Sequence, residues 1–175
     1  YRDGEAALRD LRSRAGVDPG RIVVWGRSIG AAVAVRLAAG GTDGAGPSRD
    51  RAGGADSSGD RDGTPGVAGL ILESPFTSVP DLLRQGGHVA LLALSRFGTY
   101  RFDSAALMGR VEAPVLIVHG TDDEIAPFEL GRRLYEMASG RKELAAIRGG
   151  GHNDLWALHE DEVWDAVRRF LESLD

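Results

Sequence analysis

The sequence predicts an α/β fold, a mostly parallel sheet with helices on both faces. Short, almost wholly apolar runs such as 21–26 (RIVVWG) and 113–120 (APVLIVHG) alternate with segments of helical periodicity. Unbroken apolar runs are typical of parallel strands covered on both faces, and the alternation indicates helical crossovers between them. With 42% hydrophobic and 27% charged residues, 175 residues suit one globular unit, so we expect a single domain over 1–175.

The first half of the chain begins with a helix, a strand and a second helix. In segment 3–14, Ala7, Leu8 and Leu11 share one helical face, and the following GVDPG contains the breakers of a turn. A strand over 21–26 then leads into a helix over 28–38 that is rich in small residues. The next apolar run (VAGLILESP) predicts a second strand from residue 67.

The second half repeats the pattern. A third strand over 113–120 precedes a helix over 127–139, in which Leu130, Leu134 and Met137 are in register. A weaker strand begins at residue 142 and ends in glycines, and an amphipathic helix closes the chain. We expect one apolar stripe of that helix to pack in the core: Val163, Trp164, Val167, Phe170, Leu171 and Leu174.

Two segments depart from the alternation. Residues 40–66 contain nine Gly and five Asp but no Val, Ile, Leu, Met or aromatic residue, so they cannot offset the entropy of ordering. We therefore predict a disordered Gly/Asp/Ser-rich surface insertion there. A linker between two domains is disfavoured because the strand pattern resumes at once and each flank is too small to be a domain. Residues 75–102 are irregular and amphipathic.

Composition excludes several classes of function. The net charge of −5 leaves no basic surface for nucleic acid or anionic lipid. The absence of cysteine excludes disulfides, thiolate metal sites and a cysteine nucleophile, and fits a cytoplasmic location. The longest apolar run, 89–94, is far shorter than the roughly 20 residues of a transmembrane helix. The chain opens at Tyr1 within a helical pattern, so we expect it to be N-terminally incomplete.

The junction between the first strand and the second helix reads Gly-Arg-Ser-Ile-Gly and centres on Ser28. A serine on a tight strand-to-helix corner is held above the sheet, and its neighbours two places away must be small. The N–H of Ile29, at the helix N-terminus, can then face a developing oxyanion. The alternative is an ordinary corner that happens to contain a serine.

The later strand ends carry an acid and a histidine. Glu73 ends the second strand, where a solvated acid is the favoured interpretation. Asp122 and Asp123 follow the third strand, and spacing alone does not choose between them. His152 lies on a glycine-rich loop after the fourth strand, the best position for a general base, whereas His119 is expected to pack. The order Ser, Asp, His favours a nucleophile over an ordinary corner.

These motifs resemble the α/β-hydrolase superfamily, most closely its Bem46-like and depalmitoylase-like serine hydrolases. The anchors are VVWGRSIG, LILESPFTS, PVLIVHGTDDEIAP and GGGHNDLW. The resemblance implies catalytic Ser28, Asp123 and His152, with Ile29 as an oxyanion donor and no cofactor or metal. It also implies the C-terminal part of an α/β-hydrolase fold, whose earlier strands and second oxyanion donor lie upstream of residue 21.

The function expected from this resemblance is hydrolysis of carboxylic ester, thioester or activated amide bonds through an acyl-enzyme. The substrate is expected to be a small-molecule or lipid-like acyl compound. Segment 75–102 is a candidate cap, whose apolar residues either line an acyl pocket or pack on the sheet. Two alternatives stay open: a catalytically incomplete binding or scaffold domain, and an acyltransferase that uses the same triad.

Overall fold

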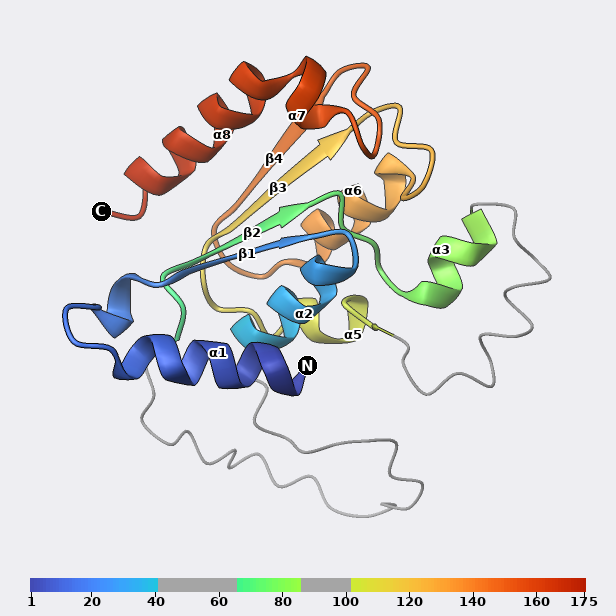
Figure 1. Cartoon of the computed structure of the whole chain (residues 1–175). Helices are drawn as coiled ribbons and strands as arrows, with labels where there is room; N and C mark the ends of the chain where they lie inside the picture. The colour runs from blue at the N-terminus through green and yellow to red at the C-terminus, as the bar shows by residue number, and fades with distance from the viewer. Residues whose placement is uncertain (41–65, 86–101) are drawn as a thin grey trace, which may run out of the picture.

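The computed structural model describes residues 1–40, 66–85 and 102–175, which include one parallel sheet (Figure 1). Its strands lie in chain order, β1-β2-β3-β4, and every neighbouring pair is parallel. The strands are β1 (Val23–Arg27), β2 (Gly69–Glu73), β3 (Val115–Gly120) and β4 (Lys142–Ile147). All residues of β2 and β3 are buried, as their unbroken apolar runs predict.

Helices cover both faces of the sheet, which confirms the predicted α/β class (Figure 1). One face carries α2, α5 and α6, with α1 beside α2, and the other carries α7 and α8. The helices are α1 (Arg2–Ser13), α2 (Ile29–Ala38), α5 (Ala105–Met108), α6 (Phe128–Met137), α7 (Leu155–Leu158) and α8 (Glu160–Glu172). A short 3₁₀ turn over Pro19–Arg21 leads into β1, and α3 (Val79–Gln85) lies beyond the carboxyl end of β2 (Figure 1).

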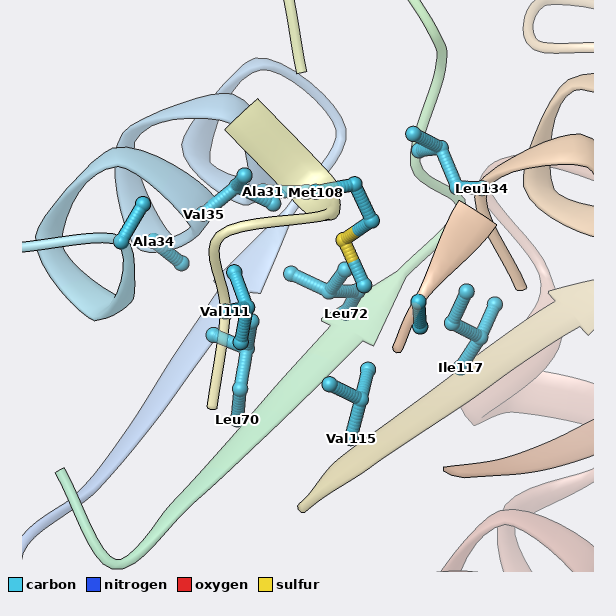
Figure 2. Packing of buried hydrophobic residues seen from close by; sticks show 12 residues of the cluster. Ala31, Ala34, Val35, Leu70, Leu72, Met108, Val111, Val115, Ile117 and Leu134 are labelled. Carbon is cyan, nitrogen blue, oxygen red and sulfur yellow. The ribbon is translucent and has the colours of Figure 1, made fainter. Parts of the chain in front are cut away.

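Alternate residues of the central strands supply the two cores. Leu70 and Leu72 of β2 lie in the core under α2, whereas Ile71 lies in the core under α8. Figure 2 shows the first core, where the buried Ala31 and Ala34 of α2 face the sheet. Because these side chains are small, α2 can lie close to β1 and β2, and its N-terminus is held directly beside the end of β1.

The apolar stripe predicted for the last helix is partly wrong. Val163, Val167 and Phe170 are buried, but Trp164 and Leu171 are 41% and 40% exposed. Each of these two residues follows a buried one, about 100° further round the helix. They therefore lie at the border of the buried face. Met137, predicted in register on α6, is likewise 42% exposed.

Two predicted segments lie largely outside the described residues. Of the predicted insertion 40–66, the structure describes the two end residues, and of the candidate cap 75–102 it describes 75–85 and residue 102. Disorder of the insertion and a role for the cap therefore stay predictions. Among the helices that the structure describes, none is long and apolar enough to span a membrane.

Candidate active site

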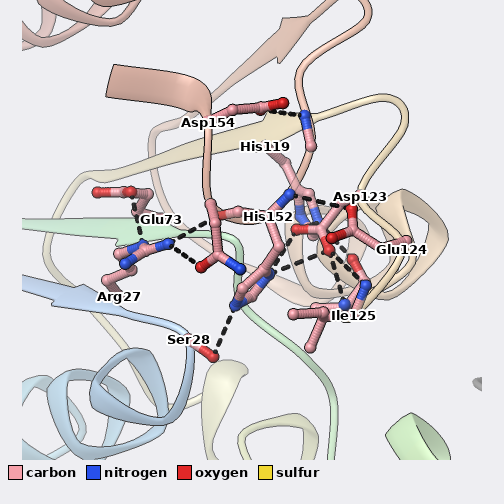
Figure 3. Close-up of polar contacts among 12 residues, drawn as sticks. Arg27, Ser28, Glu73, His119, Asp123, Glu124, Ile125, His152 and Asp154 are labelled. Atoms are coloured by element: carbon pink, nitrogen blue, oxygen red, sulfur yellow. Dashed lines mark hydrogen bonds and ion pairs between the residues drawn. The ribbon is translucent and has the colours of Figure 1, made fainter. Parts of the chain in front are cut away.

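Ser28 lies between the last residue of β1 and the first residue of α2, in a backbone conformation that side chains rarely adopt. Its φ is 51° and its ψ is −118°, and its N–H donates to the carbonyl of Glu73 at 2.8 Å. Its hydroxyl does not cap α2, so it remains available to other partners. The strained corner thus presents the Ser28 side chain at the carboxyl edge of the sheet (Figure 3).

The two glycines that flank this corner differ in what they permit. A Cβ on Gly26 would lie 2.3 Å from the carbonyl oxygen of Gly30, so the strand end and the helix require glycine there. A Cβ on Gly30 would meet nothing within 4 Å among the described residues. The expectation that both neighbours must be small therefore holds for Gly26, whereas the residues that the structure describes leave room for a Cβ at Gly30.

His152, on the loop after β4, links the hydroxyl to a carboxylate (Figure 3). Its Nε2 lies 3.2 Å from Ser28 Oγ, and its Nδ1 lies 2.8 Å and 3.0 Å from the two oxygens of Asp123. A carboxylate can only accept at these distances, so Nδ1 carries the proton and donates it. In the neutral ring Nε2 then holds a lone pair directed at Ser28. The three predicted residues come together from three separate loops.

Asp123, rather than Asp122, faces the site. Its side chain is buried and accepts the N–H groups of Ile125 at 3.0 Å and Ala126 at 2.7 Å. Burial alone would raise the pKa of Asp123, but hydrogen bonds from His119, His152 and the Ala126 N–H outweigh it and hold that pKa well below its usual range. Asp122 is exposed and accepts from the hydroxyl of Thr121.

His119 is buried at the end of β3, beneath the Asp123 loop. Its Nε2 lies 2.8 Å from the carbonyl oxygen of Ala126 and 3.4 Å from Asp123, and its ring lies edge-on to Phe128. The sequence predicts that this histidine packs, but its contact with the acid is seen only in the structure. A histidine that ends a fully buried strand could have signalled such a partner, because a buried ring requires one.

Ile29 is the first residue of α2, and the residue is 54% exposed. The first N–H groups of a helix have no partner within the helix, and the helix dipole adds partial positive charge there. The Ile29 N–H therefore lies in a position suited to an anionic oxygen formed next to Ser28. Its role as oxyanion donor stays a prediction.

The prediction that Glu73 is a solvated acid is wrong. Its side chain is only 3% exposed, and it forms an ion pair with Arg27 at 3.0 Å and accepts from the Trp156 indole at 3.0 Å. The strand that it ends is buried on both faces, so its carboxylate could not reach solvent and needs charged or polar partners. Arg27 in turn donates to the main-chain carbonyl of His152 at 2.6 Å and to Asn153 Oδ1 at 3.0 Å.

Comparison with known proteins places the chain among related sequences and folds. No protein-family model matches it. It is 35% identical over 158 residues to alpha/beta hydrolase domain-containing protein 17C of Xenopus tropicalis, and 33% identical over 158 residues to protein 17B of that name from human. These matches cover 89% of this chain. The chain belongs to the α/β-hydrolase superfamily.

Solved structures agree with this assignment at the level of fold. The acetyl xylan esterase of Paenibacillus sp. R4 matches 98% of this α/β-hydrolase chain with a TM-score of 0.68 and 23% identity. A monoacylglycerol lipase of Paleococcus ferrophilus matches 99% with a TM-score of 0.60 and 17% identity. The chain spans about half or less of its curated relatives: 51% of the uncharacterized protein Rv2307c of Mycobacterium tuberculosis, to which it is 34% identical, and 40% of the Xenopus protein.

Proposed function

We propose that this chain provides the reaction centre of a serine hydrolase that cleaves carboxylic ester, thioester or activated amide bonds. The observation that carries the proposal is the unbroken line from Ser28 Oγ through the His152 ring to Asp123, with contacts of 3.2 Å and 2.8 Å. Serine, histidine and carboxylate in this order activate a hydroxyl as a nucleophile. The similarity to α/β-hydrolase domain-containing proteins supports the same class of chemistry.

The first half-reaction transfers the acyl group to Ser28. His152 Nε2 takes the hydroxyl proton while Ser28 Oγ attacks the acyl carbonyl carbon, and the carbonyl π electrons move onto its oxygen. The Ile29 N–H stabilises that oxyanion. The tetrahedral intermediate collapses, the bond to the leaving group breaks, and His152 gives its proton to the departing alcohol, thiol or amine.

The second half-reaction releases the acid. A water molecule loses a proton to His152 Nε2 and attacks the acyl-enzyme, and the bond to Ser28 Oγ breaks as His152 returns the proton to Oγ. Ionised Asp123 holds the Nδ1–H tautomer and stabilises the imidazolium in both halves. The lowered pKa of Asp123 keeps it ionised throughout the neutral range.

Labelling by a fluorophosphonate probe tests this proposal, since such probes react with an activated serine. In the full-length protein we expect the wild type to react and Ser28→Ala to lose labelling altogether. Ser13→Ala is the matched control, because Ser13 lies exposed on α1 and its hydroxyl donates locally to the Asp10 carbonyl. Labelling of Ser28→Ala at the wild-type rate would overturn the proposal.

A further inference from the structure

The loops that carry the proposed acid and base are joined to each other by hydrogen bonds. The N–H of Asp122 donates to the carbonyl of Gly150 at 3.0 Å, and the N–H of Gly149 donates to Thr121 Oγ1 at 2.9 Å. These bonds join the loop after β3 to the loop after β4. Asp123 and His152 therefore lie on two loops that these hydrogen bonds hold in a fixed arrangement.

The nucleophile sits on a different part of the sheet. Ser28 follows β1, and β2 lies between β1 and the strands that carry the acid and the base. The contact between Ser28 Oγ and His152 Nε2 is 3.2 Å, at the long end of hydrogen-bond distances. A single long hydrogen bond does not fix the spacing of two separately supported loops, so the catalytic geometry depends on additional contacts across β2.

Arg27 makes such a contact (Figure 3). It directly precedes Ser28 and ends β1, and its Nη2 donates to the carbonyl of His152 at 2.6 Å and to Asn153 Oδ1 at 3.0 Å. The residue next to the nucleophile thus forms a hydrogen bond with the main chain of the base. Within the described residues, two direct links therefore join the end of β1 to His152: the Ser28–His152 hydrogen bond and this contact of Arg27.

Glu73 orients the Arg27 side chain for this task. The two residues lie opposite each other in the β1–β2 register, and Glu73 Oε1 is 3.0 Å from Arg27 Nε. Occupation of Nε leaves Nη2 to point at His152. The main-chain carbonyl of Glu73 also accepts the N–H of Ser28 at 2.8 Å, and the Trp156 indole donates to its carboxylate. Glu73 therefore contacts both the main chain of the nucleophile and the Arg27 side chain that bonds the base.

We propose that Arg27 and Glu73 act as a positioning pair that sets the spacing between Ser28 and His152. The inference rests on the proposed serine hydrolase function and adds two residues to it. Neither residue acts on the substrate, so their loss lowers kcat and leaves KM unchanged. Lysine cannot replace Arg27, because one ammonium cannot bond the Glu73 carboxylate, the His152 carbonyl and Asn153 with the geometry of a planar guanidinium.

The test compares Arg27→Met, Arg27→Lys and Glu73→Gln in the full-length protein. Arg27→Met keeps the aliphatic stem, and Glu73→Gln keeps the shape of the carboxylate, so either variant tests the idea if the other does not fold. Arg132→Met is the matched control, since it removes exposed ion pairs with Glu129 and Glu136 on α6. The measurements are the fluorophosphonate labelling rate, kcat and KM for p-nitrophenyl acetate, and the melting temperature.

We expect each of the three variants to fold. Each should label about 10- to 100-fold more slowly and lose kcat by a similar factor at unchanged KM, because small misplacements of reacting groups have effects of this size. The double variant Arg27→Met/Glu73→Gln should lose no more than the worse single variant, since the two act through one contact. The control should match the wild type.

Two results separate failure of this inference from failure of the proposed function. If folded Arg27→Met and Glu73→Gln label at the wild-type rate while Ser28→Ala does not label, the positioning role is wrong and the hydrolase proposal stands. If the wild-type protein itself does not label, both are wrong. A rise in KM at constant kcat, or full activity of Arg27→Lys, also overturns the positioning role.

Discussion

Replacing Asp123 by asparagine should abolish most of the proposed activity while it preserves the shape of the site. One carboxylate oxygen, Oδ1, accepts the N–H groups of Ile125 and Ala126 and lies 3.0 Å from His152 Nδ1, whereas Oδ2 makes the shorter contact with that atom, at 2.8 Å. In the variant the amide oxygen can keep the two N–H groups. Its NH₂ group then takes the place of Oδ2.

That NH₂ group would place a donor against the Nδ1–H donor of His152. The ring relieves the conflict by moving its proton to Nε2, which can then no longer accept the proton of Ser28. We expect kcat to fall by about 10³- to 10⁴-fold, the range associated with a wrong histidine tautomer in a triad. The loss of a charge-assisted hydrogen bond should lower the free energy of unfolding by about 1–3 kcal/mol.

The assay is steady-state hydrolysis of p-nitrophenyl acetate by the full-length protein, with thermal unfolding measured in parallel. Asp122→Asn is the matched control, because Asp122 is adjacent and exposed, and its side chain accepts from the neighbouring Thr121 hydroxyl; the substitution leaves its main-chain bond to Gly150 in place. We expect the control to keep wild-type kcat and stability. A loss below 10-fold in folded Asp123→Asn, or an equal loss in Asp122→Asn, would refute the assignment of the acid.

Two further predictions concern stability. Gly26→Ala should destabilise the fold by roughly 1–3 kcal/mol, since its Cβ would overlap the Gly30 backbone. Gly30→Ala should be neutral or stabilising by up to about 1 kcal/mol. Urea unfolding measures the stability of both variants, and equal destabilisation would contradict the corner geometry. The pKa of Asp123 is lower in the fold than in the unfolded chain, so its ionised form stabilises the fold at neutral pH and this contribution is lost as the pH falls below about 4. Wild-type stability should therefore fall more steeply than that of Asp123→Asn in acid, and parallel pH profiles would contradict the lowered pKa.

Local patterns were enough to predict the parallel sheet and the corner at Ser28. The apolar runs of β2 and β3 are typical of strands covered on both faces, and the tight strand-to-helix junction requires Gly26. Local patterns did not decide between Asp122 and Asp123 as the acid. The choice depends on which carboxylate turns toward His152, 29 residues away, and that direction is set by hydrogen bonds within the folded loop.

Glu73 was misjudged because its partners are distant in sequence. Trp156 lies 83 residues further along the chain, and Arg27 meets Glu73 only through the register of β1 and β2. A charge at the end of a buried strand looks solvated until the loops around it are placed. Trp164 was misassigned for a related reason: at the border of α8 its ring packs on Trp25 and Trp156, so it is neither fully buried nor free.

The most direct test of Ser28 as the nucleophile is to locate the fluorophosphonate adduct by tandem mass spectrometry after tryptic digestion of the labelled full-length protein. The peptides from Ile22 to Arg36 contain a single hydroxyl side chain, that of Ser28, so an adduct within them identifies the residue without ambiguity. We predict one adduct there, absent after heat denaturation and absent in His152→Ala. An adduct on another residue of a folded, reactive protein would contradict the assignment of Ser28 as the nucleophile.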